Sequence, residues 1–102
     1  MPTTTPITDP SRWREPDQSP DVAKSLERLR GLSWASWELA QEVRNQHLAG
    51  VTALPRKLRR RLAAARAACA AEETTLEQAR AHARAVVIAN RNRRAAVLAA
   101  KT

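Results

Sequence analysis

The chain has 102 residues, enough for one modest domain, and its 18 Lys and Arg against 10 Asp and Glu give a net charge of +8. The single cysteine, Cys69, excludes an internal disulfide, and the first residues lack the basic and apolar regions of a signal peptide. With no apolar run long enough to span a bilayer, we expect a cytoplasmic protein that has no membrane partner.

Catalysis is not indicated. The two histidines, His47 and His82, have no carboxylate or cysteine at a ligand spacing along a helix, and two glycines cannot form a glycine-rich phosphate loop. We therefore expect neither an enzyme nor a bound cofactor or metal. Cys69, among alanines, is interpreted as a small core residue.

The apolar residues are mostly small. There are 21 alanines, but Leu, Ile and Val together number only 18, and Phe and Tyr are absent. Alanine favours helix strongly but buries little surface. We therefore expect helices that form readily but need a second copy or a larger assembly to complete their packing.

Residues 1–19 contain four of the six prolines, so the sequence predicts a flexible or extended arm. Within it, Trp13 lies between Arg12 and Arg14. One interpretation is a linear motif that docks on a partner. The favoured one is that Trp13 folds back onto the protein's own thin core, because aromatic surface is scarce in this chain.

Ser19, Pro20 and Asp21 are typical of a helix start, and Gly31 followed by Ser33 predicts a break between helices over about 20–30 and 33–49. Trp34 and Trp37 share a face of the second helix. They could stack on unpaired bases, but the favoured interpretation is that they form the bulky end of a helical core. Gly50 is expected to end this helix.

The chain then turns at residues 51–55, and a helix over about 53–100 is expected to return antiparallel to the first two. Its apolar positions alternate in steps of four and three, as in a coiled coil, and Asn90 lies on this stripe. This helix is longer than the two preceding helices together, so they would leave its last third uncovered. Either it breaks near Thr74, where a capping box fits, or it is continuous and self-associates through its last third, which we slightly favour.

Residues 50–102 carry +9 while residues 1–49 carry −1, so the positive charge belongs to this long helix. Its arginines line one flank, because Arg59, Arg66, Arg80 and Arg94 are spaced by seven or fourteen residues and Arg56, Arg84 and Arg91 form the adjacent line. Such a flank can follow a phosphate backbone or an acidic protein surface, whereas the alternative is a solvated helix face. We expect binding, with little base specificity. The candidate nucleic-acid-binding residues are Arg56, Lys57, Arg59, Arg60, Arg61, Arg66, Arg80, Arg84, Arg91 and Arg94.

The sequence thus predicts an all-α protein: a helical hairpin or small bundle with one long Ala/Arg-rich C-terminal helix and a proline-rich N-terminal arm. The arm is expected over 1–19 and a single helical domain over 20–102. The expected function is that of a non-enzymatic nucleic-acid-binding accessory protein. The alternative is a scaffold, capsid or adaptor component that docks through Trp13, Trp34, Trp37, Val86, Val87 and Ile88.

Overall fold

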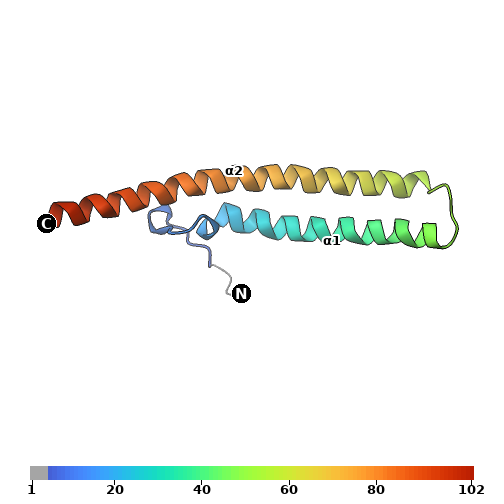
Figure 1. The fold of residues 1–102 in the computed structure, drawn as a ribbon, viewed down its shortest axis with the longest axis horizontal. Coiled ribbons are helices and arrows are strands. Elements are labelled where there is room, and N and C mark those ends of the chain that lie inside the picture. The colour runs from blue at the N-terminus through green and yellow to red at the C-terminus, as the bar shows by residue number, and fades with distance from the viewer. Residues whose placement is uncertain (1–4) are drawn as a thin grey trace. The chain divides into compact units, whose positions relative to one another are not determined.

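A computed structural model describes residues 5–102, in which two long helices, α1 and α2, are the main elements (Figure 1). Two short 3-10 helices, η1 (Pro10–Arg12) and η2 (Pro16–Gln18), precede two α-helices, α1 (Pro20–Leu48) and α2 (Arg56–Lys101). No strand occurs in residues 5–102. The prediction of an all-α fold with a long C-terminal helix is therefore confirmed.

The contacts divide the chain into two compact units. The hairpin unit is Glu27–Thr74, and the terminal unit combines the chain up to Leu26 with Thr75–Thr102. Each α-helix continues from one unit into the other, so each unit contains a part of both helices.

In the hairpin unit, the end of α1 is set by a glycine. Gly50 has a φ of +87°. Its N–H donates to the carbonyl of His47 at 3.0 Å, and the N–H of Val51 donates to the carbonyl of Gln46 at 3.0 Å. These two bonds form a Schellman motif, which satisfies carbonyls that the helix end would leave open. The predicted end of the helix at Gly50 is confirmed, and α2 begins directly after Pro55.

The predicted break at Gly31 is wrong, because α1 is continuous through this residue. A glycine inside a helix costs only about 1 kcal/mol relative to alanine, and the helix hydrogen bonds on both sides outweigh that cost. The covered stripe of α1 in this unit consists of half-buried residues, Leu29, Leu32, Ser36, Leu39 and Val43.

Because α1 continues without a break, both of its tryptophans lie away from the covered stripe. Trp34 is 61% exposed and Trp37 is 53% exposed, so the interpretation that they form a helical core is wrong. A break at Gly31 would have allowed a new register after it. Because no break occurs, the covered residues are those that follow Leu29 at spacings of three and four positions.

In the terminal unit, the segment predicted as an extended arm packs as two 3-10 turns; its first four residues lie outside those described. Pro10 and Pro16 each begin a 3-10 helix, where their fixed φ suits the first turn. Asp9 caps η1 by accepting bonds from the N–H and Oγ of Ser11 at 3.1 and 2.8 Å, which lowers the pKa of its carboxyl group. Prolines that forbid a long helix therefore start short ones here.

Trp13 is the centre of this packing. Its side chain is 5% exposed and its Nε1 donates to the carbonyl of Ile7 at 2.6 Å. The buried residues of the terminal unit are Trp13, Ser19, Val22, Ser25, Leu76, Ala83, Val87 and Asn90. The interpretation that Trp13 folds back onto the protein's own core is confirmed.

Helix α2 does not break at Thr74. The Oγ1 of Thr74 donates to the carbonyl of Ala70 at 3.2 Å, one turn back in the same helix, so the hydroxyl bonds within the helix instead of capping a new one. The continuous form of the long helix is the one observed.

Candidate nucleic-acid interface

Seven of the nine exposed cations of the hairpin unit lie in the segments on either side of its turn. Residues 43–71 contain seven basic and no acidic side chains, a net charge of +7. All seven side chains are exposed, and within residues 5–102 none of them forms an ion pair. We call this set the basic tip: Arg44, Arg56, Lys57, Arg59, Arg60, Arg61 and Arg66.

The local structure does nothing to neutralise this charge. Arg56 is the first residue of α2, and the first turn of α2 contains no acidic residue. Cations at this position face the positive end of the helix dipole, and pairs such as Arg56 with Arg60 repel one another at four-residue spacing. An anion bound at the tip would relieve both of these unfavourable interactions.

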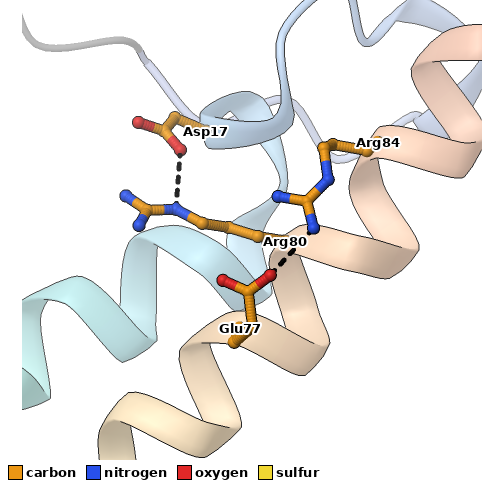
Figure 2. Close-up of polar contacts among 4 residues, drawn as sticks. All are labelled: Asp17, Glu77, Arg80 and Arg84. Atoms are coloured by element: carbon orange, nitrogen blue, oxygen red, sulfur yellow. Dashed lines mark hydrogen bonds and ion pairs between the residues drawn. The ribbon is translucent and has the colours of Figure 1, made fainter.

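The predicted arginines of the terminal unit are in a different state, because two of them form ion pairs (Figure 2). The Nε of Arg80 lies 3.5 Å from a carboxylate oxygen of Asp17 in η2. An Nη of Arg84 donates to the carboxylate of Glu77 at 2.9 Å, and this hydrogen bond lowers the pKa of Glu77. Arg80 and Arg84 are therefore partly neutralised by the protein itself.

The remaining two predicted arginines lie near the end of α2. Arg91 is exposed and Arg94 is half-buried. Arg94 lines a cavity of about 670 Å³ between the N-terminal segment and the end of α2, in which no acidic side chain takes part. The residues that line it are Ile7, Ser11, Arg12, Arg14, Gln18, Asn90, Arg93, Arg94, Val97 and Leu98.

The residues predicted to contact a protein partner are not all available. Trp13 and Val87 are buried, Val86 is half-buried, and only Ile88 of the apolar run is largely exposed, at 53%. The docking role predicted for Trp13 and Val87 is corrected accordingly, because their side chains pack inside the terminal unit. The reason is that the N-terminal segment covers part of α2 that the sequence left unpaired.

Trp34 and Trp37 are accessible and lie against each other. Their ring centroids are 5.1 Å apart with an angle of 24° between the planes, a stacked arrangement. The structure thus leaves two of the three tryptophans of the chain at the surface of the hairpin unit.

Sequence reasoning missed Arg44, which precedes the turn on α1, because it considered the arginines of the long helix alone. The sequence does contain a signal for Arg44, because no Asp or Glu occurs between Glu42 and Glu72 and the region without acidic residues therefore includes it. It also missed that Arg93 bonds to the side chain of Asn90, next to the cavity.

Residues that could support chemistry are scattered. His47 and His82 are exposed and Cys69 is half-buried. Within residues 5–102, no three His, Cys, Asp or Glu side chains lie close enough together to hold a metal ion. Neither α-helix in this part of the chain contains a stretch long and apolar enough to cross a membrane.

No protein-family model, curated protein or solved structure matches this chain.

Proposed function

We propose that this protein is a non-enzymatic nucleic-acid-binding factor that contacts phosphates through the basic tip. The observation that carries the proposal is the local charge of +7 on exposed, unpaired side chains in residues 43–71. Six of these seven cations lie within the first eleven positions of α2. Guanidinium groups bind phosphate oxygens in a forked, bidentate geometry, which makes a nucleic-acid backbone a suitable partner.

The ion pairs support a ranking of the proposed binding residues. Arg80 and Arg84 have carboxylate partners, so a phosphate would have to compete with Asp17 and Glu77. Among residues 5–102, no carboxylate forms an ion pair with a tip residue, so a phosphate meets no such competitor there. We therefore assign the main contribution to the tip and a smaller one to Arg80, Arg84, Arg91 and Arg94.

Phosphate contacts alone position a protein on nucleic acid without reading its sequence. The tip consists of long flexible cations, so it favours low sequence specificity. We expect oligonucleotides of different sequence and equal length to bind with similar affinity.

The experiment compares two variants that lose the same charge at different places. The tip variant combines Arg59→Gln, Arg60→Gln and Arg61→Gln, and the control combines Arg14→Gln, Lys24→Gln and Lys101→Gln, all at exposed positions to which no phosphate contact is assigned. Fluorescence anisotropy with labelled DNA at low salt measures the affinity. The tip variant is expected to bind at least about tenfold more weakly, and the control less than about threefold.

Equal losses in the two variants would show that only the net charge matters and would contradict a site at the tip. Absence of binding by the wild type at low salt would contradict the proposed function altogether.

The alternative function, assembly into a larger complex, is favoured by the exposed apolar side chains. Ile88 in the terminal unit and the tryptophan pair in the hairpin unit are the residues concerned. Light scattering coupled to size-exclusion chromatography tests self-assembly. A dimer or larger species that Ile88→Asp dissociates would support this function, and a monomer at all concentrations would count against a homo-oligomer.

A further inference from the structure

The exposed face of α1 in the hairpin unit contains a regular row of side chains that the phosphate contacts do not explain. These residues are spaced by four and three positions, so they lie within about 40° of one line on the helix surface. All are exposed except Gln41, which is half-buried. The row consists of Arg30, Trp34, Trp37, Gln41, Arg44 and Leu48.

The order of this row is informative, because a cation stands on each side of the stacked tryptophans. Arg30 precedes Trp34 by one turn, and Arg44 follows Trp37 by two turns. The two arginines are separated by about 21 Å along the axis of the helix. Arg44 also belongs to the basic tip, so the row leads directly into the region of highest positive charge.

The two indole rings are stacked at the surface, with more than half of each side chain exposed. Exposed indoles in contact with water are unfavourable unless another surface covers them, since large aromatic side chains bury much apolar area when they bind. A flat ring that stacks on the open side of the pair would extend the arrangement already present.

Charge decides which occupant fits this face. A second copy of this chain packed in parallel on this face would bring another tip of net charge +7 close to the first, and the two would repel. A strand of nucleic acid supplies negative phosphates for the arginines and flat bases for the indoles. In a duplex the base faces are already stacked on one another, whereas in a single strand they are open to an aromatic side chain.

We infer that the hairpin unit binds single-stranded nucleic acid, with bases stacked on Trp34 and Trp37 and phosphates held by Arg30 and the basic tip. This inference rests on the proposed function and adds to it the class of nucleic acid and the residues that select it. The tip supplies charge that any nucleic acid can use, and the tryptophans supply the preference for an unpaired strand.

The test measures binding of a labelled oligothymidine and of a duplex of equal length by the double variant Trp34→Ala, Trp37→Ala. Alanine favours helix, so α1 is expected to stay folded, which circular dichroism checks. Binding of the single strand is expected to weaken tenfold or more, and binding of the duplex to change less than about twofold. Leu48→Ala is the matched control, since it removes a 77% exposed apolar side chain from the same row and should change neither affinity.

A second variant separates stacking from general apolar contact. Trp34→Leu with Trp37→Leu keeps apolar surface but removes the flat rings, and it is expected to lose single-strand binding as the alanine variant does. Tryptophan fluorescence gives an independent signal. Oligothymidine should quench the emission of the wild type but not that of either double variant, in which only the buried Trp13 remains.

The outcomes separate this inference from the function on which it rests. If the wild type binds neither nucleic acid at low salt, both are overturned. If it binds both and the tryptophan variants bind the single strand as tightly as the wild type, the inference alone is overturned and the tip remains. If leucine restores what alanine loses, or if the tryptophans are needed for binding another protein or anionic vesicles but not oligothymidine, the face is an apolar docking surface and the inference is wrong.

Discussion

Gly31 and Gly50 occupy opposite backbone conformations, and the structure explains why only one of them needs to be glycine. Gly50 has a φ of +87°, in the left-handed region where a side chain is strained, while Gly31 lies inside α1. An added Cβ would have open space at both positions. The effect of a substitution is therefore decided by the backbone and not by a clash.

Replacing these glycines by alanine is predicted to change stability in opposite directions. Gly50→Ala should lower the free energy of unfolding by about 1–2 kcal/mol, because alanine resists the left-handed conformation. Gly31→Ala should raise it by about 0.5–1 kcal/mol, because alanine favours helix. Urea unfolding followed by circular dichroism measures both, and a stabilising Gly50→Ala would contradict the Schellman motif.

The ion pair of Glu77 with Arg84 predicts a measurable titration. The hydrogen bond from Arg84 stabilises the charged carboxylate, so the pKa of Glu77 lies below its ordinary value of 4.5. The stability that this contact contributes is present above that ordinary value and is lost as the pH falls through the lowered pKa of the folded state. NMR titration of the side-chain carboxyl carbon should show this pKa rising towards 4.5 in Arg84→Gln. An unchanged pKa in that variant would contradict the pair.

At the scale of the elements, Asn90 connects α2 to the N-terminal segment. Its side chain is 2% exposed, and its Nδ2 donates to the carbonyls of Pro10 and Trp13, both at 2.9 Å. The sequence placed Asn90 on the apolar stripe of the long helix. The structure shows it bonded to the 3-10 turns of its own chain.

Asn90→Ala is predicted to lower the free energy of unfolding by about 1–3 kcal/mol, because the buried bond to the carbonyl of Trp13 is lost and the carbonyl of Pro10 keeps only the N–H of Trp13 as a donor. The N-terminal segment should loosen, so trypsin is expected to cut after Arg12 and Arg14 faster than in the wild type. Asn92→Ala, at an exposed position in the same helix, serves as the control and should change neither property. Wild-type protection of the two arginines in Asn90→Ala would contradict the anchoring role.

The elements also show which features of the fold are readable from the sequence. The start of α1 at Pro20, its end at Gly50 and the start of α2 after Pro55 are local signals, since the residues concerned act through their own backbone. The break expected at Gly31 failed because a weak local preference for a helix end was overridden by the helix hydrogen bonds on both sides of the glycine. The prolines of the N-terminal arm are readable from the sequence, but the sequence pattern does not display that residues 10–18 form two 3-10 turns beside the buried Trp13.

The tryptophans illustrate the same limit at the candidate site. Which face of α1 is covered depends on the register that runs through Gly31, so a wrong break moved Trp34 and Trp37 into a predicted core. The clustering of the arginines was predictable from the sequence, because the charge of a side chain follows directly from the residue type. What the sequence could not show is that Arg80 and Arg84 have carboxylate partners while the tip does not.

At the scale of the whole molecule, positive charge alternates with negative charge along the chain. Residues 1–42 carry −2, residues 43–71 carry +7, residues 72–77 carry −3 and residues 78–102 carry +6. The acidic groups that form ion pairs belong to the first and third of these segments, and they pair with Arg28, Arg80 and Arg84. The basic tip therefore carries the largest block of uncompensated charge, +7, and we place the nucleic-acid contact there.

The most direct test of this account is the dependence of DNA affinity on salt concentration. If the seven tip cations each contact one phosphate of a duplex, the logarithm of the association constant should fall with the logarithm of the salt concentration with a slope of about −6. The tip variant Arg59→Gln, Arg60→Gln, Arg61→Gln should have a slope that is shallower by about 3. A wild-type slope near zero, or an equal slope in the two proteins, would contradict a phosphate-binding role for the tip.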